Sequence, residues 1–252
     1  MLEIKNISAG YGKDTVLDGV NAIVNTGKLT SIIGINGSGK STLLKSILGI
    51  IPVRCGEIAL DSQPLSSMSR NETAKRIAYL AQGRNTPDMT VEQLVLHGRF
   101  PYLSYPRRYT ERDREIAREA METLGISELG KKHLGTLSGG MRQNAYIAMA
   151  LAQDTDYILL DEPTTYLDVS HQIELMQTLQ KLARNGKGIA IVMHDLPLAF
   201  RFSDEIIVLN DKTVAAQTTP HELCRSSLIK EVFGISVAYE ENEKNFYYST
   251  RA

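Results

Sequence analysis

A glycine-rich stretch near the beginning of the chain constrains its fold more than any other feature. The stretch reads Gly34-Ile35-Asn36-Gly37-Ser38-Gly39-Lys40-Ser41-Thr42, which fits the pattern G-x-x-x-x-G-K-[ST] of phosphate-binding loops. Gly34, Gly37 and Gly39 allow the backbone to turn tightly, so that successive N–H groups point at a chain of phosphates. The stretch therefore predicts a phosphate-binding loop.

Three side chains at the end of this loop complete the expected chemistry. Lys40 can place a positive charge against the β- and γ-phosphates. Ser41 can offer its hydroxyl to Mg²⁺, and Thr42 can bond a phosphate oxygen. The apolar run 29–33 before the loop is typical of a buried strand, and residues 41–48 show helical spacing up to a glycine. Strand, loop and helix in this order are what a phosphate site at a helix N-terminus requires.

Composition narrows the class of protein further. The 252 residues suit one large α/β domain or two small ones, and a hydrophobic content of 42% is enough for a packed core. The net charge of −1 gives no basic field, so nucleic acid is not an expected partner. Cys55 and Cys224 lack C-x-x-C spacing and are typical of ordinary thiols in a reducing compartment. No apolar run reaches the roughly 18 residues of a membrane-spanning helix.

A second candidate anion site lies in the stretch Leu137-Ser138-Gly139-Gly140-Met141-Arg142-Gln143. Ser138 is a typical N-cap for a helix that would run to about Gln153. Gly139 and Gly140 would expose backbone N–H groups at the positive end of that helix. One chain seldom needs two phosphate cradles for a single nucleotide, so this duplication itself requires an explanation.

Two carboxylates follow the apolar run Tyr157-Ile158-Leu159-Leu160. Such a run is typical of a central strand in a parallel sheet, and ligands bind at the carboxyl ends of these strands. Asp161 could therefore hold Mg²⁺, and Glu162 could orient and deprotonate a water molecule. The alternative is that these acids only cap a following helix.

Three further side chains are candidate site residues only in combination with the other motifs. Tyr11, between two glycines, could stack on a purine, although an exposed loop tyrosine is more often ordinary surface. Gln82 follows a short strand expected at 77–80, and a lone glutamine there indicates little. His194 follows the apolar strand 188–193 and could bond a γ-phosphate, although a histidine in such a place is more often structural.

The rest of the pattern predicts alternating strands and helices. Further strands are expected at 2–9, 20–25, 57–60, 206–209 and 213–216, and helices at 90–98, 110–124, 168–186 and from Thr219. The helix at 110–124 opens with a capping box, Thr110-Glu111-Arg112-Asp113, and a β-hairpin is expected from Ile235. The segment 99–109, rich in arginine, proline and aromatic residues, suits either a protein contact or a solvated loop.

Taken together, these motifs resemble those of the ATP-binding cassette (ABC) ATPases over nearly the whole chain. Residues 34–42 match the Walker A motif, 137–143 the signature motif, and 157–162 the Walker B motif with its following glutamate. The shorter motifs are matched by Gln82 (Q-loop), Tyr166-Leu167-Asp168 (D-loop), His194 (H-loop) and Tyr11 (the aromatic residue of the A-loop). An ordered series of this kind is far more specific than a phosphate loop alone.

The resemblance implies an α/β fold with a RecA-like P-loop NTPase core. A parallel sheet, an N-terminal antiparallel β region and a helical subdomain at about 84–152 would form a single domain, 1–252. The resemblance also implies a homodimer with two ATP sites. Each site would join the phosphate loop of one chain, with its Tyr11, to residues of the other chain, namely Ser138, Gly139, Gly140 and Asp168.

The same resemblance assigns the chemistry of each site. Glu162, His194 and Gln82 would be the catalytic residues, and Ser41, Gln82 and Asp161 would hold Mg²⁺. Implied partners are polytopic transmembrane permease subunits and, through them, a substrate-binding protein. The chain would then work as a peripheral subunit at the cytoplasmic face of the cell membrane.

Two details refine this resemblance. The segments 98–101, 145–153, 164–168 and 232–237 are similar to those of importer ATPases for iron-siderophore, haem or cobalamin. Met141 departs from the family, whose signature usually has glutamine there. The anion site at 138–140 should survive this change, which bears on the hydrolysis rate or on its coupling to a partner.

Other classes of protein remain as alternatives. The chain could be the ATPase of a different ABC transporter, for another small solute or for export. Soluble ABC proteins that act on ribosomes or DNA usually have two cassettes or a long coiled coil. A small GTPase needs an Asn-Lys-x-Asp motif, which Asn210-Asp211-Lys212 does not supply. A regulatory cassette without activity would lack Glu162 or His194, and both are present.

Overall fold

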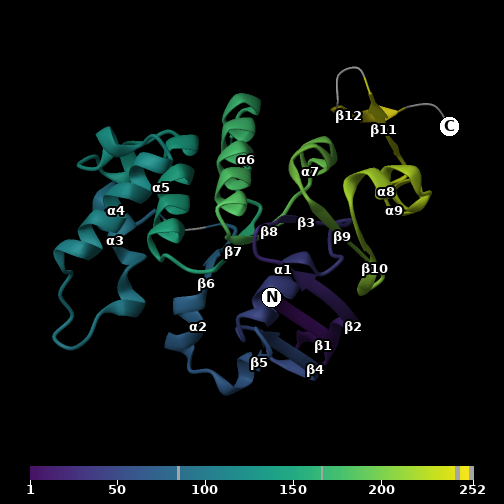
Figure 1. The fold of residues 1–252 in the computed structure, drawn as a ribbon, viewed down its shortest axis with the longest axis horizontal. Coiled ribbons are helices and arrows are strands. Elements are labelled where there is room, and N and C mark those ends of the chain that lie inside the picture. The colour runs from purple at the N-terminus through teal and green to yellow at the C-terminus, as the bar shows by residue number, and fades with distance from the viewer. Residues whose placement is uncertain (84–85, 166, 242–244, 250–252) are drawn as a thin grey trace.

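Two sheets, a small hairpin and a set of helices make up the chain, as the computed structural model in Figure 1 shows. The structure describes residues 1–83, 86–165, 167–241 and 245–249. The beginning of the expected helical subdomain (84–85) and Tyr166 of the expected D-loop lie outside these residues. None of the helices in this part of the chain is long and apolar enough to cross a membrane.

A largely parallel six-stranded sheet forms the centre of the molecule. From one edge to the other it contains β10 (Thr213–Thr218), β9 (Glu205–Asn210), β3 (Leu29–Ile33), β8 (Gly188–Val192), β7 (Tyr157–Asp161) and β6 (Ile77–Leu80). β10 pairs antiparallel with β9, and the other neighbours pair in parallel. Every residue of β3, β7 and β8 is buried, which explains their mostly apolar sequences. The loops after these parallel strands emerge at one edge of the sheet.

An antiparallel sheet packs against one face of this central sheet (Figure 1). It contains β2 (Asp14–Val24), β1 (Leu2–Tyr11), β4 (Val53–Leu60) and β5 (Gln63–Pro64). Helix α1 (Lys40–Ile47) lies between the two sheets, with Leu43, Leu44 and Ile47 buried in their shared apolar cluster. The helix that follows the phosphate loop is therefore fixed on both sides.

Helices cover the opposite face of the central sheet. Between β6 and β7 in the chain come α3 (Val91–His97), α4 (Glu111–Thr123) and α5 (Gly139–Ala152), which pack together at one end of the molecule (Figure 1). The remaining elements are α6 (Val169–Arg184), α7 (Leu196–Phe202), α8 (Pro220–Arg225), α9 (Leu228–Phe233), β11 (Ser236–Glu240) and β12 (Asn245–Ser249). β11 and β12 form the expected hairpin. Its Phe246 packs on Phe200 of α7 at a ring distance of 5.3 Å.

Several elements differ from the sequence-based expectation, and α7 and α9 are among the helices that it did not include. β2 begins at Asp14 rather than at residue 20, and β4 begins at Val53 rather than at residue 57. Both extensions pair with β1 across irregular register, which interrupts the alternation that marks a strand in the sequence. Helix α2 (Arg70–Arg76) was not expected, although Ser69 and Glu72 form a capping box at its start.

The segment 99–109 combines a buried anchor with an exposed loop. Arg99 is buried, with Nε 3.0 Å from the Asp113 carboxylate and Nη1 donating to the carbonyl of Ala152. Burial alone would raise the pKa of Asp113, but hydrogen bonds from Thr110 and Arg99 hold it below the usual value. Tyr105 is 97% exposed. A solvated loop is thus wrong for Arg99, which joins α4 to α5, and a protein contact by the rest of the segment stays a prediction.

Candidate nucleotide-binding site

The phosphate loop connects β3 to α1, and its backbone leaves no room for side chains at two glycines. A Cβ atom at Gly34 would lie 2.4 Å from the carbonyl oxygen of Leu209 and 2.5 Å from Ser38 Oγ. Gly39 caps α1 in the left-handed region at φ 100°, and a Cβ there would lie 2.7 Å from Leu17. Glycine is therefore required at both positions.

Two polar side chains of the loop are buried in a way that fits a phosphate group. The Lys40 ammonium group donates to the carbonyls of Gly34 and Ile35 at 2.9 and 3.0 Å. Burial lowers the pKa of Lys40 below its ordinary value, and the nearby charges of Glu162 and Asp161 only partly oppose this shift. Ser38 Oγ is buried and has no hydrogen-bond partner among the described residues. A buried cation and an unpaired hydroxyl at the start of a helix are both satisfied by an anion.

A hydroxyl and a carboxylate meet beside this loop. Ser41 Oγ donates to Asp161 Oδ1 at 2.9 Å, and the Tyr79 hydroxyl lies 3.4 Å from Oδ2. Burial raises the pKa of Asp161, and the hydrogen bond from Ser41 opposes this shift. Hydroxyl and carboxylate oxygens are the donors that Mg²⁺ prefers, so this pair fits that cation.

Glu162, directly after β7, is held by two side chains from different loops. Gln82 Nε2 donates to one carboxylate oxygen at 2.6 Å, and His194 Nε2 lies 2.5 Å from the other. Gln82 follows β6 and His194 follows β8. The sheet therefore brings together three residues that are far apart in the chain. Neither acid caps a helix, since Asp168 is the N-cap of α6, so the alternative reading of Asp161 and Glu162 is wrong.

Tyr11 lies at the end of β1, in the hairpin that leads into β2. Its ring is half exposed, and Tyr11 pairs with Asp14 across a tight turn. Two residues further on, Val16 approaches the phosphate loop: a Cβ at Gly39 would lie 3.3 Å from Val16 Cγ1. The hairpin that carries Tyr11 thus lies beside the phosphate loop.

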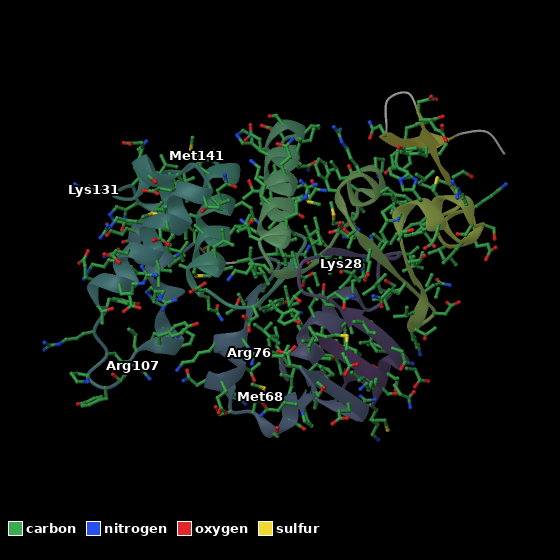
Figure 2. All side chains as sticks on the ribbon, in the orientation of Figure 1. Lys28, Met68, Arg76, Arg107, Lys131 and Met141 are labelled. Atoms are coloured by element: carbon green, nitrogen blue, oxygen red, sulfur yellow. The ribbon has the colours of Figure 1, made fainter. Side chains whose placement is uncertain are left out.

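The second cradle lies elsewhere in the molecule. Ser138 caps α5 by accepting a hydrogen bond from the N–H of Met141. Figure 2 shows Met141 at the top of the helical group, well away from α1 in Figure 1. The D-loop neighbours it, because Gly140 closely approaches Leu167. In this chain, then, the residues 138–140 do not line the site formed by the phosphate loop.

Asp168 lies at the exposed start of α6. Its carboxylate accepts hydrogen bonds from the backbone of His171 and the hydroxyl of Ser170 and contacts the His171 ring. These bonds, the backbone one first, lower the pKa of Asp168 to about 2. Asp168 therefore carries a negative charge at neutral pH.

Sequence reasoning did not identify Tyr79 or Val16 as parts of this region. Tyr79 lies in the middle of β6, where its only sequence signal is strand periodicity. Val16 reads as an ordinary apolar strand residue. Their roles depend on the pairing of distant strands, which no local motif encodes.

A phosphate loop between a buried strand and a helix, with acidic residues at the end of a parallel strand, defines a P-loop nucleoside triphosphatase. Within that class, the sequence pattern described as "ABC transporter" matches residues 17–165. The chain belongs to the ABC transporter family, as an ATP-binding subunit. Subunits of this kind hydrolyse ATP to power transport, and both the expected family and the expected fold are confirmed.

Individual relatives are similar in sequence over most of the chain. The petrobactin import ATP-binding protein of Bacillus anthracis is 43% identical over 92% of this chain and 86% of its own length. The ferric enterobactin transport ATP-binding protein of Escherichia coli (strain K12) is 41% identical over 92% of this chain and 86% of its own. A solved dimeric bacterial ABC transporter cassette superposes with a TM-score of 0.76 at 30% identity, covering 87% of this chain and 99% of that one.

Proposed function

We propose that the chain is the ATP-hydrolysing subunit of an importer for a metal chelate, with a ferric siderophore as the cargo. The observation that carries this proposal is the identity of 41–43% to ATP-binding subunits named for petrobactin import and ferric enterobactin transport. Haem and cobalamin are the other chelates considered. The subunit would work at the cytoplasmic face of the membrane, bound to permease subunits.

The site geometry supports a defined role for each motif. The loop 34–42 binds the ATP phosphates, and Tyr11 stacks on the adenine ring. Mg²⁺ supplies positive charge to the phosphates when bound, and the residues that would hold it are Ser41, Gln82 and Asp161. Glu162 orients the attacking water and accepts its proton, while His194 holds Glu162 and reaches the γ-phosphate.

A homodimer would explain the second cradle. Residues 138–140 precede Met141 at the start of α5, and Figure 2 shows Met141 at the top of the helical group, away from α1. In a head-to-tail pair, this cradle and Asp168 would face the ATP bound to the other chain. The likeness to a dimeric cassette supports such a pair. ATP binding would close the dimer, and hydrolysis would reopen it.

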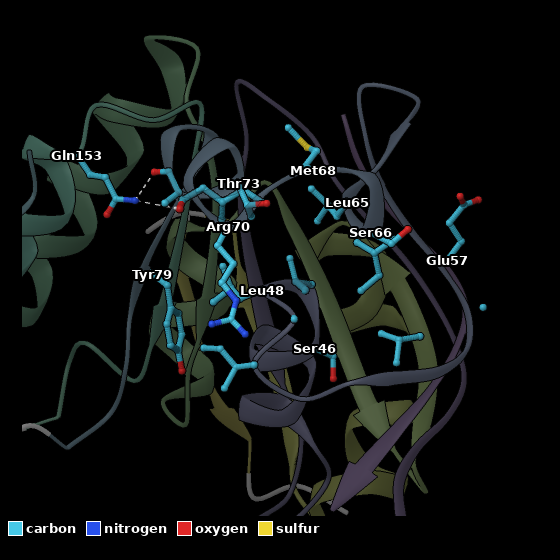
Figure 3. A pocket seen from close by; sticks show the side chains of 18 residues that line it. Ser46, Leu48, Glu57, Leu65, Ser66, Met68, Arg70, Thr73, Tyr79 and Gln153 are labelled. Atoms are coloured by element: carbon cyan, nitrogen blue, oxygen red, sulfur yellow. Dashed lines mark hydrogen bonds between the residues drawn. The ribbon is translucent and has the colours of Figure 1, made fainter. Parts of the chain in front are cut away.

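An open groove at the far end of α1 is a candidate attachment site for the permease. The groove has a volume of about 1190 Å³ and lies between α1, α2, β4 and β6 (Figure 3). Its lining includes Leu48, Ile50, Met68 and Tyr79, and Ile50 is 60% exposed. A cytoplasmic segment of a permease with apolar side chains would cover this surface. Since β6 leads directly to Gln82, movement there would reach the Glu162 carboxylate.

Transport of a defined cargo tests the proposal. The chain would be reconstituted in lipid vesicles with its permease and binding protein, and ATP-dependent uptake of a ferric siderophore, haem and cobalamin would be measured in parallel. We expect uptake of the ferric siderophore in the wild type and none with Glu162→Gln. Uptake of haem or cobalamin alone would disprove the siderophore assignment, and ATP hydrolysis without uptake of any chelate would disprove the import assignment.

A further inference from the structure

Arg54 forms an unexpected link between β4 and the hairpin that carries Tyr11. Its side chain reaches past the end of β1. Nη2 donates to the carbonyls of Gly12 and Asp14 at 2.9 and 3.1 Å, and Nη1 donates to Thr15 Oγ1 at 3.0 Å. Arg54 itself is exposed and contributes nothing to the two buried apolar clusters. Three hydrogen bonds from one guanidinium group therefore fix a surface turn.

The tethered turn joins Tyr11 to β2, the strand that passes beside the phosphate loop. Tyr11 pairs with Asp14, and Gly10 pairs with Thr15. Two of the residues that accept hydrogen bonds from Arg54, Asp14 and Thr15, therefore lie on the strand opposite Tyr11. The next residue, Val16, approaches the phosphate loop, because a Cβ atom at Gly39 would lie 3.3 Å from Val16 Cγ1. The turn has no buried side chain of its own. Its position relative to the phosphates depends on strand pairing and on the guanidinium group.

We propose that Arg54 is a positioning residue for nucleotide binding. It holds the hairpin 11–15 so that the Tyr11 ring stands at the distance from the phosphate loop that an adenine nucleotide spans. This inference rests on the stacking role given to Tyr11 under the proposed function. Arg54 need not touch ATP, because its effect is to reduce the freedom that the turn would otherwise lose on binding.

The test compares ATP with inorganic tripolyphosphate, which offers the phosphates without the base. In calorimetry on the purified full chain, we expect Arg54→Ala to weaken ATP binding by about three- to tenfold, part of the value of one stacked base. Tripolyphosphate binding should change by less than about twofold. The KM for ATP should rise while kcat at saturating ATP stays unchanged. The ATP affinity of Arg54→Lys should lie between those of the wild type and Arg54→Ala, because an ammonium group cannot bind the three acceptors in the geometry of a guanidinium group.

Matched variants separate this inference from the stacking proposal on which it rests. Tyr11→Ala should weaken ATP binding and leave tripolyphosphate binding intact, and Arg54→Ala should add nothing in the Tyr11→Ala background. Arg225→Ala replaces an exposed arginine of α8 and is the control. It should change the affinity for neither ATP nor tripolyphosphate.

Each other outcome has a definite meaning. An equal loss of both ligands in Arg54→Ala would show a general effect on the phosphate loop and overturn the inference. No loss of ATP binding in Arg54→Ala, with a selective loss in Tyr11→Ala, would overturn it and leave the stacking role intact. If Tyr11→Ala has no selective effect, the stacking proposal itself fails.

Discussion

Glu162 is the residue in which the local geometry and the proposed chemistry are most closely linked. Its φ of 52° is in the left-handed region, which is unfavourable for a residue with a side chain. Strained backbone of this kind persists where surrounding contacts enforce it, and it clusters at functional sites. Here the contacts are those to Gln82 and His194. They orient the carboxylate at the edge of the sheet where the phosphate loop begins.

Replacing this carboxylate tests its proposed role as the general base. Glu162→Gln keeps the size of the side chain but cannot accept the proton of water. We expect ATP binding to remain and turnover to fall by about 10²-fold or more, measured as phosphate release beside ATP binding. His194→Ala is the matched comparison. Near-normal hydrolysis in Glu162→Gln, together with a large loss in His194→Ala, would transfer the role to His194.

The buried ammonium group of Lys40 makes ATP binding depend on pH. Burial lowers its pKa from 10.5, and a bound phosphate favours the charged form. ATP affinity should therefore be highest at neutral pH, where Lys40 is protonated. It should fall as the pH rises through the lowered pKa of Lys40, at a pH below 10.5. Lys40→Ala should bind ATP weakly and lack this pH dependence in calorimetric titrations. An unchanged ATP affinity in Lys40→Ala would contradict the role of the phosphate loop.

At the scale of elements, the sequence predicted strands and helices correctly where a local residue pattern is enough to specify the element. The buried strands β3, β7 and β8 and the capped helices α4, α5 and α6 were predictable from apolar runs and from Thr110, Ser138 and Asp168. The full lengths of β2 and β4 were not, because bulged pairing with β1 hides their alternation. The burial of Arg99 depends on its distant partner Asp113, which composition does not reveal.

The Arg99–Asp113 pair should be a major stabilising contact of the helical group. Arg99→Ala leaves a buried carboxylate without its cation, which costs about 3–5 kcal/mol in comparable buried pairs. Arg112→Ala breaks the exposed pair with Glu115 and should cost about 0.5 kcal/mol or less. Urea denaturation of both variants measures the difference. Equal and small losses would mean that the buried pair contributes no more than a surface pair.

The groove in Figure 3 gives a prediction about permease attachment. Ile50→Asp places a charge on its exposed apolar rim and should weaken association with the permease by about tenfold or more, while ATP binding by the isolated chain stays unchanged. Ile23→Asp changes another partly exposed isoleucine, on β2, and serves as the control. Co-purification from detergent measures both variants. Equal association of the two with the permease would exclude the groove as the attachment site.

At the scale of the whole molecule, the motifs identified the candidate site because each is contiguous, and because the phosphate loop, Gln82, Glu162 and His194 all follow strands of the central sheet. The structure adds what joins them: the Ser41–Asp161 contact, the two bonds to Glu162, and the link from Arg54 to the Tyr11 hairpin. These contacts arise from the order of strands in the sheets, which short motifs do not specify. The distance between the two cradles within one chain is likewise visible only in the fold.

Mixing two inactive chains tests most directly whether ATP is hydrolysed at sites shared between two copies. Lys40→Ala damages the phosphate loop, and Ser138→Arg fills the second cradle with a bulky side chain, so each variant alone should be nearly inactive. In the mixed dimer one site carries both lesions and the other carries neither. We predict that the mixture regains ATP hydrolysis, or at least tight ATP binding and ATP-dependent dimerisation at the intact site. If the mixture shows neither activity nor ATP-dependent dimerisation, the shared-site arrangement is wrong for this protein.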